Sequence, residues 1–310
     1  KNKHNYMGTN KITAKDLTWH HFDQISEGDL DQLQQQFKFH HLDYEDIRSE
    51  TPISKMDVYK HYIFFVFHVP TIHQETGHVY GDELYVFLSK DEIVTLTRSP
   101  IESLNSFFHR IDTGTKFRNS LLSKGTSHLL YRLLMASFRD SLSIAAKLTQ
   151  EVTRIEEAIE SHHEKRITVD LAHARRNILF LRHIVDPQRN MLTSLSNTKR
   201  SFISEDTLVY FDDLHDVLDT IWLTSDNLKL IIDGLFDVNE ALLSHKTNEI
   251  VTLLTIVSAA LMVPTLIAGF YGMNVDWLPF SANPEVVSMF YLLGFVGMLV
   301  LVIAVVRRPR

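Results

Sequence analysis

A line of small and hydroxyl-bearing residues runs through the longer of two apolar segments near the end of the chain. Its members recur at alternating intervals of three and four residues, which places them on one face of a helix. They are Asn248, Val251, Thr255, Ser258, Met262, Thr265, Gly269 and Gly272. Such a face could line a water-filled passage. Alternatively, the hydroxyls bond their own backbone and the small residues allow close helix packing.

Both apolar segments are long enough to cross a membrane. Ile250–Val275 holds 26 residues without a charge, and Val286–Val306 holds 21 more. A helix needs about 20 apolar residues to span a bilayer. Two such segments in succession favour a membrane protein over a buried helix of a soluble one. Because two helices cannot enclose a water-filled hole, any passage must be shared among several copies of the chain. The second segment has no polar line and suits an outer, lipid-facing ring.

The charges predict the orientation of these spans. Three arginines follow the second span, at positions 307, 308 and 310, whereas the connector holds Asp276 and Glu285 and no basic residue. Basic flanks stay in the cytoplasm. We therefore expect a multi-pass protein of the inner or plasma membrane, with both termini cytoplasmic and the connector outside.

The composition excludes several classes of function. The residues before Ile250 include 28 basic and 36 acidic ones, a net charge of −8, which disfavours nucleic-acid binding. The absence of cysteine rules out disulfides and thiolate metal sites. There is no phosphate-binding loop motif and no convincing catalytic constellation, so we expect neither a pump nor an enzyme. The polar start, Lys1–Lys11, does not look like a secretory signal.

The first hundred residues predict a mixed α/β fold. Asp57–Pro70 and Asp82–Pro100 are rich in β-branched and aromatic residues, as strands are. Short helices are expected around Asp29–Phe37 and Tyr44–Ile47. Ser99–Glu102 has the pattern of a capping box and predicts a third helix start.

The remainder of the front part predicts helices only. Leu129–Glu160 and Val169–Leu195 are amphipathic, with a kink expected at Pro187. A helix of about 100 Å should run from Ser204, its N-cap, to Tyr271. Its apolar stripe predicts packing against other helices, including those of other copies. The stripe comprises Leu208, Phe211, Leu214, Leu218, Ile221, Leu228, Ile231, Leu235, Val238 and Leu242.

The expected fold class is an α+β cytosolic domain with a mixed sheet, a long helical stalk and two transmembrane helices. The expected divisions are an α/β domain at 1–125, a helical hairpin at 126–203, a stalk helix at 204–271 whose membrane part begins near 250, an outer loop at 272–285, a second span at 286–306 and a basic tail at 307–310.

The residues Tyr271-Gly272-Met273-Asn274, at the outer end of the first of two terminal spans, resemble the signature of the CorA family of divalent-cation channels. Two upstream segments, Lys246–Ile256 and His40–Ile47, also resemble that family, and the order of elements agrees over nearly the whole chain. The resemblance implies a funnel-shaped homopentamer in the membrane lipid, with the first span lining a pore for Mg²⁺. Passive influx suffices, since a divalent ion gains about 4.6 kcal/mol across 100 mV.

The resemblance also implies roles along the pore. A ring of Asn274 amides would receive Mg²⁺ with its water shell intact, because Mg²⁺ loses water reluctantly. Gly272 would permit close approach of the backbone, and Tyr271 and Met273 would brace the loop. Alternatively, Asn274 is only a helix C-cap. Val251, Leu254 and Met262 correspond to a hydrophobic constriction that gates by dewetting, and Asn248 to a polar ring at the cytosolic end.

Cytosolic feedback is implied as well. Glu45 and Asp46 match one side of a regulatory Mg²⁺ site between subunits, and Asp213 matches its partner on the stalk. Carboxylates that repel across an interface make the closed assembly depend on cation concentration. The alternative is that they are ordinary solvated acids. The outer loop departs from the family pattern, because Phe280 stands where an acid is common, although Asp276 is present and Glu285 could compensate.

Two further interpretations remain open. The histidine pairs at 20–21, 40–41 and 162–163 raise the possibility of Zn²⁺, Co²⁺ or Ni²⁺ as cargo or regulator, although we expect surface histidines without a metal role. From a different class, the chain could be a sensor or scaffold whose terminal helices serve only as an anchor.

Overall fold

The computed structural model describes residues 9–14, 17–49, 53–161, 166–198, 200, 202–203, 205–273 and 283–306. Contacts divide the chain into two compact units, Lys1–Phe236 and Asp237–Arg310. The strands are β1 (Thr9–Ala14), β2 (Leu17–Phe22), β3 (Lys55–Val58), β4 (Tyr62–Ile72), β5 (Val79–Ser89) and β6 (Glu92–Thr97). The helices are α1 (Glu27–Gln36), α2 (His41–Ser49), α3 (Glu102–Thr113), α4 (Thr115–Leu122), α5 (Thr126–Ser161), α6 (Ile167–Ser196), α7 (Glu205–Tyr271) and α8 (Pro284–Val306).

The first unit is built on a mixed sheet with the strand order β1-β2-β6-β5-β4-β3. β2 and β6 are parallel, and the other neighbouring strands are antiparallel. Together with the helices that follow it, this sheet confirms the predicted α+β fold class with a long helix near the end of the chain.

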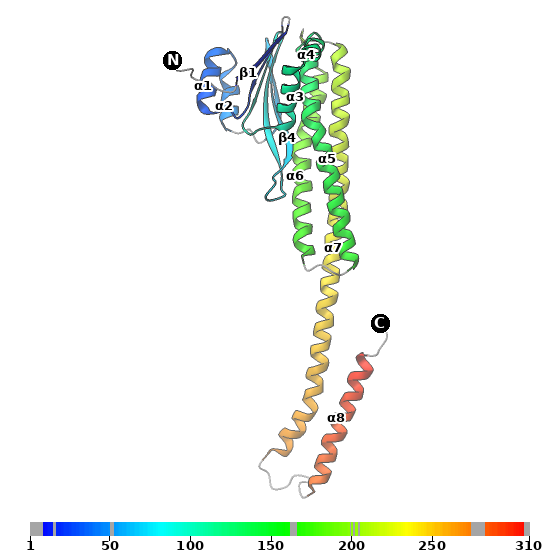
Figure 1. The fold of residues 1–310 in the computed structure, drawn as a ribbon. Coiled ribbons are helices and arrows are strands. Elements are labelled where there is room, and N and C mark those ends of the chain that lie inside the picture. The colour runs from blue at the N-terminus through cyan, green and yellow to red at the C-terminus, as the bar shows by residue number, and fades with distance from the viewer. Residues whose placement is uncertain are drawn as a thin grey trace. The chain divides into compact units, whose positions relative to one another are not determined.

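Helices cover both faces of the sheet (Figure 1). On one face, Phe64 and Val66 of β4 belong to a core cluster with residues of α1 and α2, such as Leu33 and Tyr44. On the other face, the ring of Phe67 lies 6.2 Å from that of Phe138 on α5. Burial on both faces explains why β4 is a nearly continuous run of apolar residues rather than an alternating one.

The predicted helices are present in the structure, but the apolar stripe of α7 differs from the expected one. Its buried positions keep a strict alternation of three and four residues. Between Thr207 and Asn239 they are Thr207, Phe211, Leu214, Leu218, Ile221, Ser225, Leu228, Ile232, Leu235 and Asn239. Ile231, which the sequence analysis places on the stripe, is 44% exposed, and Val238 is 48% exposed. The prediction of burial within one chain was wrong at Ile231 because the adjacent Ile232 takes the buried position, and at Val238 because the polar Asn239 does.

The helix caps also correct the sequence analysis. Ser26 caps α1 in a reciprocal capping box with Asp29, which we did not predict. Conversely, Ser99 is not the cap of α3, because Ile101 holds that position without a side-chain hydrogen bond. Ser204, the predicted cap of α7, lies outside the described residues. Pro187 lies inside α6.

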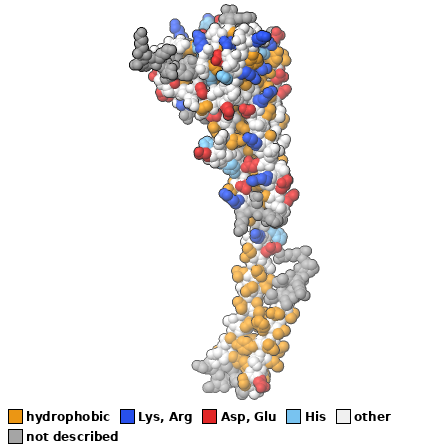
Figure 2. All heavy atoms as spheres, viewed as in Figure 1, with side chains coloured by type: hydrophobic (Ala, Val, Ile, Leu, Met, Phe, Trp, Pro, Cys, Tyr) orange, Lys and Arg blue, Asp and Glu red, His pale blue; other side chains and the backbone are white. Residues whose placement is uncertain are grey.

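The second unit consists of the end of α7 and α8. The helix Asp206–Tyr271 is long and apolar enough to cross a membrane, and none of its most apolar window is buried. The two helices pack through Gly294 of α8, where a Cβ atom would lie 3.4 Å from Ile267 and 3.5 Å from Val263. Figure 2 shows hydrophobic side chains exposed along these helices, whereas charged side chains are scattered over the first unit.

Candidate functional site

The line of small and hydroxyl-bearing residues lies on the face of α7 that points away from α8. At 3.6 residues per turn, this line is about 150° around the helix from the contacts of Val263 and Ile267 with α8. Apart from Ala260, which is buried, the described residues from Ile250 to Gly269 are exposed or half-buried. The single chain therefore leaves this face uncovered.

The hydroxyls on this face bond the helix backbone. Thr255 Oγ1 donates to the carbonyl of Val251 at 2.8 Å, and Thr265 Oγ1 donates to that of Leu261 at 2.7 Å. The hydroxyl protons are thus used within the helix, as the alternative interpretation of these residues expected. However, a hydroxyl oxygen retains acceptor capacity when its proton is donated. The face can still accept hydrogen bonds from water.

An open groove of about 650 Å³ follows the outer half of this line. Its lining residues are Ser258, Leu261, Met262, Thr265, Leu266, Gly269, Phe270 and Met273. Among the residues predicted to form a constriction, Val251 is 51% exposed, Leu254 64% and Met262 68%. Exposed apolar side chains of this size usually contact a partner surface or lipid.

Gly272 is required by the backbone at the end of α7. Its N–H donates to the carbonyl of Ala268 at 2.8 Å, directly after the last helical residue, Tyr271. A Cβ atom at Gly272 would lie only 2.9 Å from the same carbonyl oxygen, which is closer than real Cβ atoms come. Met273 is exposed.

Three predicted residues of the outer mouth remain, namely Asn274, Asp276 and Glu285. Asn274 and the loop acid Asp276 lie outside the described residues, so their roles stay predictions. Glu285, the second loop acid, is exposed in the first turn of α8. A carboxylate is stabilised at a helix N-terminus by the helix dipole.

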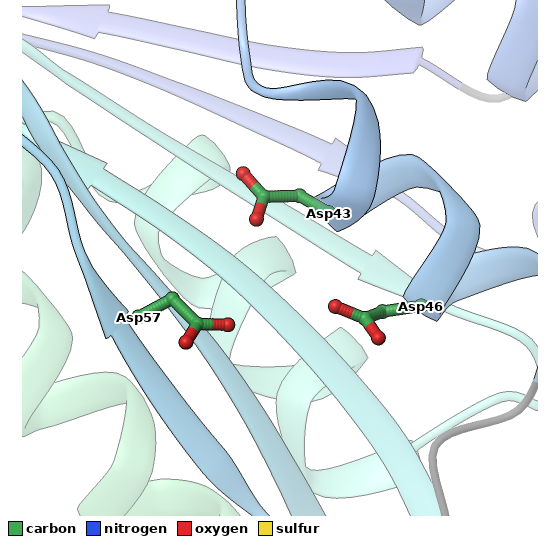
Figure 3. Close-up of side chains that lie close together, drawn as sticks. All are labelled: Asp43, Asp46 and Asp57. Carbon is green, nitrogen blue, oxygen red and sulfur yellow. The ribbon is translucent and has the colours of Figure 1, made fainter.

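The acidic residues of the first unit gather at α2. Glu45 is exposed and Asp46 is half-buried. Carboxylate oxygens of Asp43, Asp46 and Asp57 lie within 4.8 Å of one another (Figure 3), and we call these three residues the acidic cluster. Carboxylate oxygens are the ligands that Mg²⁺ prefers. Asp43 and Asp57 were not among the predicted site residues. Asp43 lies one helical turn before Asp46, and the sheet brings Asp57 close to both.

Lys55 on the edge strand β3 balances part of this charge. Its Nζ atom lies 2.5 Å from Oδ2 of Asp46 and 2.8 Å from Oδ2 of Asp57. Burial works to lower the pKa of Lys55, but the bonds and charges of Asp46 and Asp57 outweigh it and raise that pKa. Lys55 is therefore a cation fixed beside the acids.

Asp43 is bound differently from the other two acids. Its side chain is buried, and its two oxygens accept hydrogen bonds from the hydroxyls of Tyr59, at 2.7 Å, and Tyr62, at 2.6 Å. Burial raises the pKa of Asp43, and the two tyrosine hydrogen bonds oppose that rise. Asp43 thus anchors α2 to the sheet.

Asp213 does not join this cluster within one chain. It is exposed on α7, where burial and the Asp213 carboxylate together raise the pKa of Tyr131 on α5. Figure 1 shows α2 and the first part of α7 on opposite sides of the sheet. A site that combines Asp46 with Asp213 therefore requires two chains.

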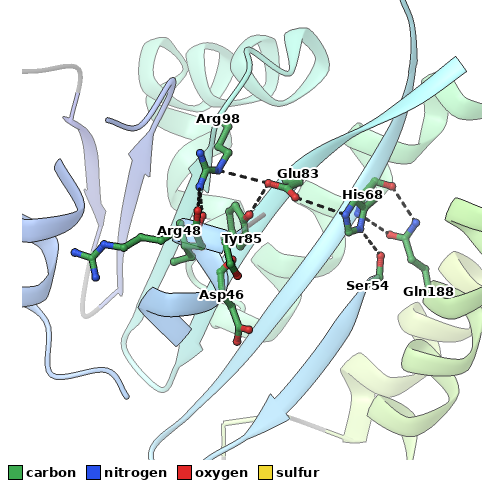
Figure 4. A network of polar contacts seen from close by, with 10 residues as sticks. Asp46, Arg48, Ser54, His68, Glu83, Tyr85, Arg98 and Gln188 are labelled. Atoms are coloured by element: carbon green, nitrogen blue, oxygen red, sulfur yellow. Dashed lines mark hydrogen bonds and ion pairs between the residues drawn. The ribbon is translucent and has the colours of Figure 1, made fainter. Parts of the chain in front are cut away.

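A polar network links α2 to α6 across the sheet (Figure 4). Arg98 contacts the C-terminal end of α2 and lies 3.6 Å from Glu83. Glu83 faces His68 on the neighbouring strand, with 3.9 Å between Oε1 and Nε2. Gln188 of α6 donates to the carbonyl of His68 at 2.9 Å, and Ser54 contacts its ring at 2.8 Å. The network couples two helices on opposite faces.

In the described part of the chain, the histidine pairs join no group of three side chains that could hold a metal ion. His20 and His21 of β2 are buried, which corrects our expectation of surface residues. They point to opposite faces, because His20 packs edge-on against Phe37 while His21 bonds Thr95. The rings of the pair at 40–41 lie 4.5 Å apart, and the pair at 162–163 lies outside the described residues.

The chain thus combines an α/β unit with a helix that is long and apolar enough to cross a membrane and that exposes a polar line. Residues 14–308 match the model of the family described as CorA-like Mg²⁺ transporter protein. The chain belongs to this family of divalent-cation transporters, and it is not an enzyme.

Individual relatives agree with this assignment. The chain is 28% identical to the cobalt/magnesium transport protein CorA of Thermotoga maritima over 264 residues, covering 84% of this chain and 74% of that one. It is 25% identical to the putative metal ion transporter YfjQ of Bacillus subtilis, covering 87% of this chain and 82% of that one.

The fold is also that of solved transporters. The complete structure of the CorA magnesium transporter from Methanocaldococcus jannaschii superposes with a TM-score of 0.79 at 18% identity, covering 97% of this chain and 94% of that one. The full-length CmaX structure superposes with a TM-score of 0.71 at 17% identity, covering 91% and 88%. At these identities the likeness concerns the fold.

Proposed function

We propose that this chain is the subunit of a homopentameric channel for divalent cations, with Mg²⁺ as the preferred ion and passive influx driven by the membrane potential. α7 lines the pore, α8 faces lipid, both termini are cytoplasmic, and Tyr271-Gly272-Met273-Asn274 forms the outer mouth. The observation that carries the proposal is the exposed polar line on α7, which points away from the only neighbouring helix described in its own unit.

The relatives support the choice of ion. Those from Thermotoga maritima and Methanocaldococcus jannaschii are named cobalt/magnesium transport proteins. Hydroxyl and amide oxygens suit a hard cation that keeps its water, because Mg²⁺ favours oxygen ligands and dehydrates reluctantly. Co²⁺, Ni²⁺ and Zn²⁺ are then competitors rather than the main cargo.

The regulatory part of the proposal assigns the inhibitory Mg²⁺ site to Glu45 and Asp46 of one subunit and Asp213 of the next. α2 and the first part of α7 lie on opposite sides of the sheet in one chain, which supports a site shared between chains. Mutual repulsion of these carboxylates is relieved when a cation binds, so Mg²⁺ stabilises the closed assembly by mass action.

Matched threonines provide the test of the pore assignment. Thr255 and Thr265 lie on the exposed line. Thr252 lies off it but makes the same backbone bond, to Asn248 at 2.7 Å. Purified protein in liposomes should take up Mg²⁺ under a negative internal potential, with weaker uptake of Co²⁺, Ni²⁺ and Zn²⁺. Thr255→Val and Thr265→Val should reduce uptake by about fivefold, which corresponds to about 1 kcal/mol for lost hydrogen bonds to water.

Thr252→Val is the control and should leave uptake close to that of the unaltered protein. Equal effects of all three substitutions would place the pathway elsewhere. No ion flux from folded pentamers would favour a membrane-anchored sensor instead. Faster uptake of Zn²⁺ than Mg²⁺ would overturn the assigned ion but not the pore.

A further inference from the structure

The acidic cluster already contains a cation that belongs to the protein. The ammonium of Lys55 touches Asp46 at 2.5 Å and Asp57 at 2.8 Å. The two oxygens of Asp43 are engaged by Tyr59 and Tyr62, so Lys55 divides its contacts between the other two acids. Figure 3 shows the three carboxylates converging from α2 and β3.

A divalent cation that binds Asp46 comes close to this ammonium. Two cations at one carboxylate repel each other, and the repulsion is strong when the groups are partly shielded from water. The side chains of Asp46 and Lys55 are 26% and 35% exposed, so some shielding remains. Binding of the metal is thus favoured when Lys55 withdraws from Asp46.

Lys55 has a place to withdraw to. Its stem is flexible and its ammonium carries three donors, so one contact can be released while the other is kept. Asp57 lies two residues along the same strand and is 40% exposed, so it can keep the ammonium as Asp46 is released. The metal then replaces Lys55 as the cation beside Asp46, and Lys55 keeps its ion pair with Asp57.

We propose that Lys55 competes with the divalent cation for Asp46 and thereby sets the cation concentration at which the regulatory site between subunits fills. The inference rests on the proposed role of Asp46. Lys55 keeps the site empty at low concentration, and Asp57 determines how easily Lys55 leaves. The concentration at which the channel closes is then a property of the chain's own ammonium as well as of the ligands.

The test measures the Mg²⁺ concentration that gives half of the maximal Mg²⁺-induced rise in Tm of the purified full-length protein in detergent. Lys55→Met should lower this midpoint by about two- to fivefold, the range equivalent to a partly exposed ion pair. Lys55→Arg keeps the charge and should stay near the unaltered midpoint. Asp57→Asn leaves Lys55 on Asp46 alone and should raise the midpoint. If Lys55→Met does not yield folded protein, Asp57→Asn carries the test.

The outcomes distinguish failure of the regulatory site at Asp46 from failure of the competition by Lys55. Asp46→Asn should raise the midpoint or abolish the response. An unchanged response in that variant would overturn the proposed regulatory site itself. If Asp46→Asn alters the midpoint but Lys55→Met lowers only the Tm measured in EDTA, Lys55 is a structural ion pair and the competition is refuted. An unchanged or lowered midpoint in Asp57→Asn refutes it as well.

Discussion

Arg98 donates from Nη2 to the backbone carbonyl of Arg48 at 2.9 Å, and a second contact from the same atom reaches the carbonyl of Ile47. These carbonyls belong to the last turn of α2. A guanidinium at this position satisfies acceptors that a helix end leaves open and complements the helix dipole. The helix that carries Glu45 and Asp46 is therefore held from its C-terminal end by a strand-end arginine.

Arg98→Met should destabilise the protein by about 1.5–3 kcal/mol, because charge-assisted hydrogen bonds to α2 are lost. Chemical denaturation followed by circular dichroism measures the change. Arg154, a largely exposed residue of α5 whose nearest partner oxygen lies 3.8 Å away, is the control, and Arg154→Met should shift stability by less than about 0.5 kcal/mol. Equal effects would mean that Arg98 does not secure α2.

Gly272→Ala should reduce ion uptake by about tenfold, since strain of about 1–3 kcal/mol must be relieved by moving the end of α7. A Cβ atom there would approach the carbonyl of Ala268 to 2.9 Å. Gly297 of α8 is the matched control, because a Cβ atom added to it would meet nothing within 4 Å in the described part of the chain. Uptake by Gly297→Ala should match that of the unaltered protein, and equal uptake by both variants would refute the requirement for glycine.

An acid introduced at the apolar positions of the α7 face should make the channel leak. Met262→Asp or Val251→Asp would wet the proposed constriction, which would otherwise close by excluding water, so flux at inhibitory Mg²⁺ should rise. Met262→Leu keeps the volume and the apolar character and should remain closed. Currents recorded in planar bilayers report the leak. Flux unaffected by either acid would place both residues off the pathway.

Loss of the two acids Glu45 and Asp46 on α2 should release the channel from feedback. Glu45→Ala combined with Asp46→Ala should move half-inhibition of influx to a higher internal Mg²⁺ concentration, by about tenfold or more, because carboxylate ligands are removed. Asp91→Ala with Glu92→Ala removes another adjacent pair of acids, exposed in and beside the β5–β6 turn, and should leave inhibition unchanged. Unaltered inhibition in the first variant would refute the sensor assignment.

The first unit, Lys1–Phe236, should lose stability in mild acid. Burial lowers the pKa of His20 to about 4, with a smaller contribution from Lys11. Between pH 6.5 and pH 4, His20 is protonated in the unfolded chain but stays neutral in the folded one. The free energy of unfolding therefore falls by up to about 1.4 kcal/mol per pH unit until pH 4.

His20→Phe keeps a ring against Phe37 and should flatten this slope when unfolding is measured between pH 7 and 5. The slope should not vanish, because burial also lowers the pKa of His21. His109→Phe alters an exposed histidine and should keep the full slope. A full slope in His20→Phe would assign the acid sensitivity to other groups.

The sequence was informative where a pattern repeats and ambiguous where it does not. The strands and long helices follow from hydrophobic periodicity, which extends over many residues. The register of α7 could not be predicted at Ile231 and Ile232, because both residues are equally apolar. Only packing decides which of them is buried.

The acidic cluster could also be predicted only in part from the sequence. Glu45 and Asp46 were predicted because they are adjacent in a segment that resembles the family. Asp57 and Lys55 belong to a different element, and only the pairing of β3 with β4 brings them to α2. Contacts between elements depend on tertiary structure, which a linear pattern does not encode.

The backbone bonds made by Thr255 and Thr265 have a consequence for the sign of the ion that the proposed pore face would favour. With each hydroxyl proton directed at a carbonyl of the preceding turn, the outward side of the oxygen presents lone pairs only. An anion moving past would find no donor from these groups, whereas the water around a cation would find acceptors. A neutral surface can in this way discriminate by charge without a single ionised side chain.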